Sequence, residues 1–355
     1  MDKKPQVVVG MSGGVDSSVA AALLVEKGYE VTGLMLRLWS EPGEECANRC
    51  CTPDSMFQAR RVASQLGIPF YVVDAKEIFY QQVVEPFIAS YLQGETPNPC
   101  LLCNRQVRWG TMLEHALALG GDLLATGHYA RVETASDGSL RLLRGLDNNK
   151  DQSYVLSVLS PDQLSRSIFP LGGLTKPQVR AEAHRFGLPV AERAESQDLC
   201  FLGEGTYIDF LRRHAPNSFA PGPILNRKGE TLGEHTGLPF YTIGQRKGLR
   251  IAAPAPLYVI EKDADRNALI VGHLEELGRS QLTGKQVNWL IAPPAAPLRA
   301  QVKIRYKAAD AWATLIPQED QRVLVAFESP LRDITAGQRA VFYAGEQCLG
   351  SALIE

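Results

Sequence analysis

Two features of the sequence could carry out chemistry: a Ser-Gly-rich run near the start and a set of cysteines. The run Met11–Ser18 reads MSGGVDSS and follows the apolar stretch Val7-Val8-Val9. A glycine-rich turn between a strand and a helix typically holds an anion, because backbone amides point into it. Asp16 adds a carboxylate to this turn. A bound Mg²⁺ would offset that charge beside phosphates.

The spacing of this run excludes two common nucleotide loops. Counted from Gly10, the Gly and Lys positions of a Walker A loop hold Val15 and Asp16, and a dinucleotide fingerprint fails at Ser12. We expect Gly13 and Gly14 to let a phosphate approach the backbone, with Ser17 and Ser18 donating hydroxyls and capping the next helix. The plainer alternative is a tight turn in which Asp16 is the N-cap.

The cysteines are odd in number, and no export signal precedes them, which argues against a disulfide framework. Reactive or metal-binding thiols fit better. Two of them form a Cys-x-x-Cys pair that follows prolines. The seven are Cys46, Cys50, Cys51, Cys100, Cys103, Cys200 and Cys348.

The first half of the chain alternates between strand-like and helix-like patterns. Four helical patterns return to strands through glycines at 28, 67, 94 and 120, which suit helix C-caps. This alternation predicts a doubly wound parallel sheet, whose ligands lie at the carboxyl ends of the strands. The expected strands are 7–9, 31–38, 70–73 and 123–125; the expected helices are 18–27, 55–66, 76–92 and 105–119.

The second half has short alternating runs broken by proline and glycine. A hairpin is expected at 257–260 and 268–271, followed by an antiparallel β-barrel. We therefore predict a catalytic domain at 1–205, a small central domain at 206–277 and a barrel at 278–355. The expected barrel strands are 298–306, 311–316, 322–327, 338–343 and 350–354.

The overall composition is that of an ordinary globular protein. The formal net charge is −2 and charged residues make up 21%. This balance argues against non-specific binding along nucleic acid, but it allows a local basic face. The sequence has no secretory signal and no apolar stretch of membrane length. We expect a cytoplasmic protein without a membrane partner, and a monomer because no long exposed apolar helix is evident.

Several motifs together resemble one enzyme family. Ser12–Ser17 is similar to the pyrophosphate loop (PP-loop) of the N-type ATP pyrophosphatases. The runs TPNPCLLCN (96–104), ATGHY (125–129), KDQSY (150–154), Cys200-Phe201 and GQRKGL (244–249) resemble tRNA-specific 2-thiouridylases, from about Val7 to the C-terminus. The resemblance implies a sulfurtransferase that adenylates O2 of the wobble uridine of tRNA and releases AMP and pyrophosphate.

The resemblance assigns ATP contacts in the first half of the chain. Leu36 would pack on adenine where relatives often have Met, and Gly127 would leave room for the nucleotide at a strand end. Asp16 would act in catalysis with Mg²⁺. The implied ATP-binding residues are Gly10, Met11, Ser12, Gly13, Gly14, Val15, Asp16, Ser17, Leu36 and Gly127.

Sulfur transfer needs a persulfide carrier and a thiol that frees the sulfur. The resemblance assigns Cys200 as the carrier and Cys103 as the nucleophile, with a transient Cys103–Cys200 disulfide afterwards. Both lie in predicted loops, and Pro97 and Pro99 stiffen the approach to Cys103. That suits a loop holding a flipped base.

Cys100 stands where many relatives have an aspartate, and two interpretations remain open. It tunes or assists the neighbouring thiol, or Cys100, Cys103 and Cys200 ligate an iron–sulfur cluster. Cys46, Cys50 and Cys51 resemble zinc spacing only loosely, without a nearby histidine, so we expect a non-catalytic role. Cys348 falls in a predicted strand and is expected to pack.

The resemblance also implies tRNA contacts along the chain. Arg305-Tyr306-Lys307 places cations beside an aromatic ring, which suits phosphate contact and base stacking. The expected tRNAs are those for Lys, Glu and Gln, and a persulfide sulfur-donor protein is an expected partner. The implied tRNA-binding residues are Asn98, Pro99, Cys100, His128, Lys150, Asp151, Gln152, Arg305, Tyr306 and Gln338.

Three other functions remain open from the sequence. An amidating ligase of the same superfamily would adenylate an oxygen but would not need paired cysteines. A non-catalytic tRNA-binding protein would bind tRNA without consuming ATP. An iron–sulfur carrier would need no SGGVDS loop.

Overall fold

The computed structural model describes residues 5–41, 52–194, 199–202 and 205–355. The chain divides into two compact units. The first comprises Met1–Val84, Pro99–Gly205 and Gly345–Leu349, and the second comprises Glu85–Asn98, Thr206–Ala344 and Gly350–Glu355. Each unit is assembled from three separate segments, whereas the sequence predicted three consecutive domains. Those domain bounds stay a prediction.

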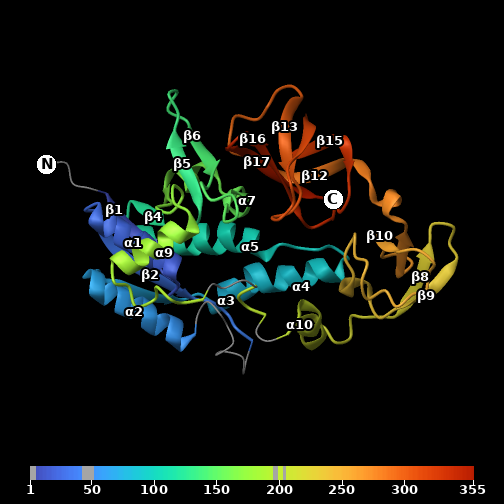
Figure 1. The fold of residues 1–355 in the computed structure, drawn as a ribbon, viewed down its shortest axis with the longest axis horizontal. Coiled ribbons are helices and arrows are strands. Elements are labelled where there is room, and N and C mark those ends of the chain that lie inside the picture. The colour runs from blue at the N-terminus through green and yellow to red at the C-terminus, as the bar shows by residue number, and fades with distance from the viewer. Residues whose placement is uncertain (1–4, 42–51, 195–198, 203–204) are drawn as a thin grey trace. The chain divides into compact units, whose positions relative to one another are not determined.

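The first unit is built on a parallel sheet of order β3-β2-β1-β4-β7 (Figure 1). Its strands are β1 (Gln6–Gly10), β2 (Glu30–Arg37), β3 (Phe70–Asp74), β4 (Leu123–Ala125) and β7 (Ser167–Ile168). Its helices are α1 (Val15–Glu26), α2 (Pro53–Leu66), α3 (Lys76–Phe79), η1 (Tyr80–Val84), α5 (Pro99–Leu102), η2 (Cys103–Met112), α6 (Leu113–Ala118), α7 (Ser153–Leu156), α8 (Pro161–Ser165) and α9 (Lys176–Arg185).

Strand alternation divides the core of this unit between two faces. Val7 and Val9 of β1 pack in one cluster with α1, α2 and α9. Val8 points to the other face, where it lies beside Gly121 at the end of α6. Because β1 is covered on both sides, it reads as an unbroken apolar run, as strands of buried parallel sheets do.

The four predicted helices are found, and three of them start earlier than expected, at Val15, Pro53 and Pro99. Thr52 accepts a hydrogen bond from the Ser55 amide at 3.0 Å, and Pro53 begins α2. The glycines predicted to end helices, at 28, 67, 94 and 120, all have positive φ. A hairpin of β5 (Ala130–Thr134) and β6 (Leu140–Arg144) was not expected, and Gln347 and Cys348 pair with β6 within this unit.

The earlier start of the fourth predicted helix changes the expected setting of Cys103, a candidate catalytic residue. Cys103 lies inside a helical stretch that begins at Pro99, rather than in a loop. Proline is favoured at the first helical position, since its missing N–H has no partner there and its φ suits the helix. Pro99 therefore begins this helix, whereas we expected it to stiffen a loop.

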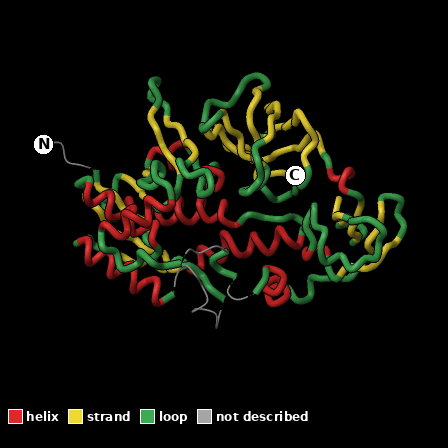
Figure 2. The backbone as a smooth tube through the Cα atoms, viewed as in Figure 1, coloured by secondary structure: helices red, strands yellow, loops and turns green. Residues whose placement is uncertain are grey.

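The second unit contains a four-stranded sheet and an antiparallel barrel, and strands dominate this part of the chain (Figures 1 and 2). The sheet comprises β8 (Gly222–Asn226), β9 (Thr231–His235), β10 (Tyr258–Asp263) and β11 (Ala268–Gly272). Its helices are α4 (Glu85–Leu92), α10 (Tyr207–His214), η3 (Leu238–Phe240) and η4 (Leu274–Leu277).

The barrel closes where β12 pairs with both β15 and β17. Its interior follows strand alternation, with Ala313 and Leu315 of β14 buried. The predicted fold class is confirmed: a parallel α/β sheet, a small central domain and a C-terminal antiparallel barrel. The barrel strands are β12 (Arg279–Trp289), β13 (Leu298–Lys303), β14 (Ala311–Gln318), β15 (Arg322–Leu331), β16 (Arg339–Ala344) and β17 (Gln347–Ile354).

Candidate functional site

The Ser-Gly-rich loop lies where β1 ends and α1 begins, at the carboxyl edge of the sheet. The Met11 amide donates to the carbonyl of Leu34 at 2.8 Å, which continues the strand pairing into the loop. Gly13 has a φ of +72°, and a Cβ there would lie 2.1 Å from the carbonyl oxygen of Ser55. Only glycine fits this turn, so its tip packs directly against the start of α2.

Serine hydroxyls hold the loop from inside. The Ser12 amide donates to Ser17 Oγ at 3.1 Å, while the Ser17 and Ser18 hydroxyls donate to the Gly14 carbonyl at 3.3 and 2.8 Å. Ser17 and Ser18 therefore do not cap the helix, because α1 begins at Val15 and Gly14 is its N-cap. Within the described residues no side chain caps α1, which leaves a helix start of the kind that favours anions.

The Asp16 carboxylate accepts hydrogen bonds from two side chains of distant elements. Lys176 Nζ lies 2.7 and 2.8 Å from its two oxygens, and the Tyr129 hydroxyl donates to Oδ1 at 2.8 Å. The Lys176 side chain is 10% exposed and that of Asp16 is 34% exposed. The structure thus supplies a lysine as the counter-charge, where the sequence suggested only a bound cation.

Sequence reasoning missed Lys176, although a signal was present. Thr175, Pro177 and Gln178 have the capping-box pattern of a helix start, which places Lys176 in the first turn of α9. A cation there opposes the helix dipole and needs nearby anions. Asp147 accepts the Lys176 amide at 2.9 Å, and Asp16 binds the ammonium.

Arg193 is a second cation at the loop that the sequence did not reveal. Its guanidinium donates to the Gly13 carbonyl at 3.1 Å and to Ser55 Oγ at 3.0 Å, and pairs with Asp54 at 2.8 Å. It therefore fastens the tip of the loop to the first turn of α2.

Gly127 follows β4 and lies against the same loop. A Cβ on Gly127 would lie 2.8 Å from backbone atoms of both Asp16 and Ser17. We expected a side chain here to block the nucleotide; the structure shows that it would collide first with the loop backbone. Gly10 and Leu36 lie at the ends of β1 and β2 in this region, and Leu36 is buried.

His128 lies beside Gly127 but points into the protein. Its ring is 7% exposed, shares a 2.7 Å hydrogen bond with Thr126 and packs against Trp109 and Phe169. Burial, with a smaller contribution from Arg108, lowers the pKa of His128 well below its usual value. A side-chain contact with tRNA would require this packing to change, and that contact stays a prediction.

The Lys150-Asp151-Gln152 run is tied into the first unit. Buried Asp151 accepts bonds from the Gly145 and Ser153 amides, both at 3.0 Å. Gln152 Oε1 accepts the Tyr129 amide at 3.0 Å, and so supports the tyrosine that binds Asp16. Contact of this run with tRNA also stays a prediction.

The cysteines differ in exposure. Cys100 is exposed, Cys103 is 9% exposed and Cys200 is half-buried. Asn104 donates to the Val155 carbonyl at 3.0 Å, which fixes the helix that carries Cys103. Phe201 packs edge-on against Phe79 of α3, with ring centroids 5.9 Å apart, and α3 packs against η2. Both catalytic candidates therefore belong to segments that pack on α3.

Within the described part of the chain, no three His, Cys, Asp or Glu side chains are grouped so as to hold a metal ion. Cys100, Cys103 and Cys200 are therefore not grouped as metal ligands in this structure, and the iron–sulfur cluster is not shown. Cys46, Cys50 and Cys51 lie outside the described residues. Cys348 is buried in β17, in keeping with a packing role.

In the second unit, two residues expected to contact tRNA make internal bonds. Arg305 donates to the Ile243 carbonyl at 3.3 Å and to the Thr335 hydroxyl, and Gln338 donates to the Thr96 carbonyl at 2.7 Å. Tyr306 lies beside Lys303. Their contacts with tRNA stay predictions. The Gln338 bond also fixes the segment that leads to Asn98.

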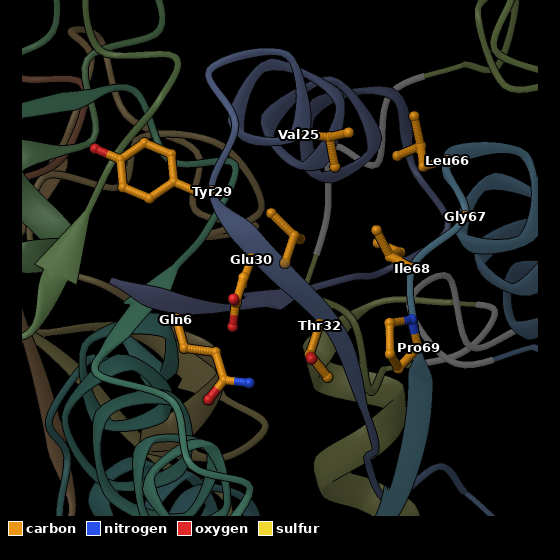
Figure 3. A pocket seen from close by; sticks show the side chains of 10 residues that line it. Gln6, Val25, Tyr29, Glu30, Thr32, Leu66, Gly67, Ile68 and Pro69 are labelled. Carbon is orange, nitrogen blue, oxygen red and sulfur yellow. The ribbon is translucent and has the colours of Figure 1, made fainter. Parts of the chain in front are cut away.

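A surface hollow of about 390 Å³ lies elsewhere in the first unit (Figure 3). It is lined by Gln6, Glu30 and Pro69, which stand at the amino ends of β1, β2 and β3. The Ser-Gly-rich loop (Met11–Ser18) lies at the opposite, carboxyl ends of these strands. The hollow is therefore separate from the candidate site.

The fold and the loop together define the class. A parallel sheet whose first strand ends in SGGVDS, at the uncapped start of α1, makes this an α/β enzyme of the ATP-pyrophosphatase (PP-loop) class. Residues 5–204 match the tRNA methyl transferase HUP domain family. Residues 208–273 match the tRNA methyl transferase PRC-barrel domain and 279–354 the aminomethyltransferase beta-barrel domain.

Curated relatives extend over nearly the whole chain. The tRNA-specific 2-thiouridylase MnmA of Geobacter metallireducens is 47% identical, covering 99% of this chain and 97% of the relative. That of Moorella thermoacetica is 48% identical, covering 98% and 99%. The chain belongs to the family of tRNA-specific 2-thiouridylases, which are tRNA sulfurtransferases.

Solved structures similar to this chain are more remote. A 4-thiouridine synthetase–RNA complex with bound ATP is 14% identical with a TM-score of 0.34, covering 60% of this chain and 51% of that one. NMN synthetase from Francisella tularensis is 21% identical with a TM-score of 0.35, covering 61% and 78%. Likeness at this level supports no inference about ligands. Among the described residues, no helix has the length and apolar character needed to span a membrane.

The fit of Gly127 against the loop leads to a first prediction. Gly127→Ala should reduce ATP consumption by about 10- to 100-fold, because the added Cβ displaces the loop backbone. The free energy of unfolding should fall by about 1–3 kcal/mol. Gly173→Ala is the matched control, since its Cβ would meet nothing within 4 Å. Equal activity of both variants would contradict the close packing of Gly127 against the loop backbone.

The Asp16–Lys176 pair can be measured by a double-mutant cycle in urea. Asp16→Asn and Lys176→Met should show a coupling of about 1–3 kcal/mol, because each single change leaves a partly buried charge without its partner. The Glu26–Arg185 pair is about half exposed and should couple more weakly despite its shorter 2.6 Å contact. A weaker coupling for Asp16–Lys176 than for this pair would refute the assignment.

Buried His128 should make the protein sensitive to acid. Its folded pKa is well below 6.5, so under more acidic conditions the unfolded chain takes up a proton that the folded chain does not. Stability should therefore be lost as the pH falls below 6.5, by up to about 1.4 kcal/mol per pH unit from this group. Urea unfolding between neutral and mildly acidic pH should show a flatter dependence for His128→Phe. Identical slopes would count against a buried neutral imidazole.

Proposed function

We propose that this chain converts the wobble uridine of tRNA to 2-thiouridine, with ATP activating the uridine oxygen. The observation that carries the proposal is that the first unit contains both the Ser-Gly-rich loop and the segments bearing Cys103 and Cys200. Full-length relatives named for this reaction support it. The proposed substrates are the tRNAs for Lys, Glu and Gln, with a persulfide protein as sulfur donor.

ATP would bind with its β- and γ-phosphates in the loop. Gly13 and Gly14 bring the backbone close, and the uncapped start of α1 points its positive end at the phosphates. Uridine O2 then attacks the α-phosphorus. The bond from this phosphorus to the bridging oxygen breaks, so AMP joins O2 and pyrophosphate leaves.

Lys176 would stabilise the leaving pyrophosphate. Asp16, which also accepts a hydrogen bond from Tyr129, holds the lysine side chain at the first turn of α1, so its charge is already in place when negative charge develops. Because Asp16 is partly exposed, its carboxylate also fits a Mg²⁺ carried in with ATP. Such an ion would neutralise phosphate charge.

Sulfur would arrive as a persulfide on Cys200. The Cys103 thiolate attacks Cys200 Sγ, a Cys103–Cys200 disulfide forms, and hydrosulfide leaves. Hydrosulfide attacks C2 of the adenylated uridine, and AMP departs with the former O2. No step is assigned to an iron–sulfur cluster, because Cys100, Cys103 and Cys200 are not grouped as metal ligands among the described residues.

The remaining assignments concern tRNA. The proposed contacts are Asn98 and Pro99 around the base, the exposed Arg246 and Lys247, and the barrel residue Tyr306. Arg305 and Gln338 would support neighbouring segments as well as RNA, since both donate to backbone carbonyls.

Thiolation in a defined mixture tests the proposal. With tRNA, ATP, Mg²⁺ and a persulfide donor, the intact chain should form 2-thiouridine, detected by mass spectrometry of nucleosides. Cys103→Ser and Cys200→Ser should each abolish it, because each removes a sulfur that forms or breaks a bond. Cys348→Ala, at a buried thiol of the barrel strand β17, is the control.

Three outcomes would contradict the proposal. Full thiolation by both serine variants would reject the roles of Cys103 and Cys200. An aminated or methylated uridine in place of 2-thiouridine would assign another reaction. Binding of tRNA without release of AMP would indicate a binding protein.

A further inference from the structure

Cys100 and Cys103 lie three residues apart near the start of one helical stretch that runs from α5 through η2. Residues at this spacing share a helix face, with Cβ atoms about 5–6 Å apart. A disulfide needs about 3.5–4.5 Å between the Cβ atoms. The required shift is small, and Cys100 lies in the first turn of α5.

The two thiols differ in their access to solvent. Cys100 is exposed, whereas Cys103 is 9% exposed. A disulfide that joins Cys103 to half-buried Cys200 has little surface for an external thiol to attack. A disulfide that joins Cys103 to Cys100 presents an exposed sulfur. The Cys-x-x-Cys pair therefore offers a route from a sheltered disulfide to an accessible one.

We propose that Cys100 is the resolving cysteine of the sulfur-transfer cycle. This inference rests on the proposed function. Once hydrosulfide has left, the Cys100 thiolate attacks Cys103 Sγ of the Cys103–Cys200 disulfide. The Cys103–Cys200 bond breaks, Cys200 leaves as a thiolate, and a Cys100–Cys103 disulfide forms.

The cycle closes by reduction from outside. An external dithiol supplies two electrons and two protons to the exposed Cys100–Cys103 disulfide and becomes a disulfide itself. Cys200 is regenerated before this step and can already accept the next persulfide sulfur. The rate of repeated turnover then depends on Cys100, whereas the first transfer does not.

The test compares the full-length wild type with Cys100→Ser. Each protein is loaded with persulfide sulfur, given tRNA and ATP without reductant, quenched with acid, alkylated and digested for mass spectrometry. The wild type should carry the Cys100–Cys103 disulfide, and Cys100→Ser should retain Cys103–Cys200. The first turnover of 2-thiouridine should be equal. With limiting dithiol, repeated turnover should fall about tenfold in Cys100→Ser, while Cys348→Ala behaves as the wild type.

The outcomes separate this inference from the proposed function. If the wild type makes 2-thiouridine but ends as Cys103–Cys200, and Cys100→Ser turns over equally fast, Cys100 is not the resolving cysteine. Loss of the first turnover in Cys100→Ser, with an unchanged urea midpoint, also overturns the role, because a resolving cysteine acts only after sulfur has left. No 2-thiouridine from the wild type would reject the proposed function itself.

Discussion

The Asp16 carboxylate is held by a lysine from the start of α9 and a tyrosine that follows β4, two elements far from the loop in sequence. These contacts place the loop, the end of the sheet and α9 in one arrangement. The lysine is nearly buried, so the arrangement is costly to break. Gly127 permits it, because any side chain there would enter the backbone of Asp16 and Ser17.

This interaction explains how a phosphate loop tolerates an aspartate. The carboxylate does not repel phosphate alone; it fixes an ammonium group beside the positive end of α1. Arg193 then joins the loop tip to α2 through the Gly13 carbonyl and Asp54. The cations and the helix start are in place before any ligand enters, which is how preorganised sites stabilise developing charge.

The sequence predicted the parts of the fold that local patterns encode. Apolar runs and helix-ending glycines indicated the parallel sheet, and the motifs indicated the family. Lys176 and Arg193 were not recognised as site residues, because their partners lie 160 and 139 positions away. The helix start at Thr175 indicated only that Lys176 needs a nearby anion, not that Asp16 supplies it. Ser17 and Ser18 were wrongly expected to cap α1. A capping serine and one that bonds back to the carbonyl of Gly14 look alike in sequence.

For Cys103, the motif was recognised but its local structure was not. Its prolines suggested a rigid loop, whereas Pro99 begins a helix and Asn104 ties that helix to Val155. His128 likewise lay in a motif that implied an RNA contact, yet its buried ring packs against Trp109 and Phe169. Motifs identify which residues occur together, but packing decides which of them reach the surface.

The central claim is that the loop adenylates the oxygen that sulfur replaces. It is tested most directly with tRNA whose wobble uridine carries a heavy oxygen isotope at O2, incubated with the chain, ATP and a persulfide donor. The account predicts that the heavy oxygen appears in the phosphate group of AMP, in step with 2-thiouridine formation. Heavy oxygen in water, with unlabelled AMP, would show that ATP cleavage does not activate this oxygen and would contradict the account.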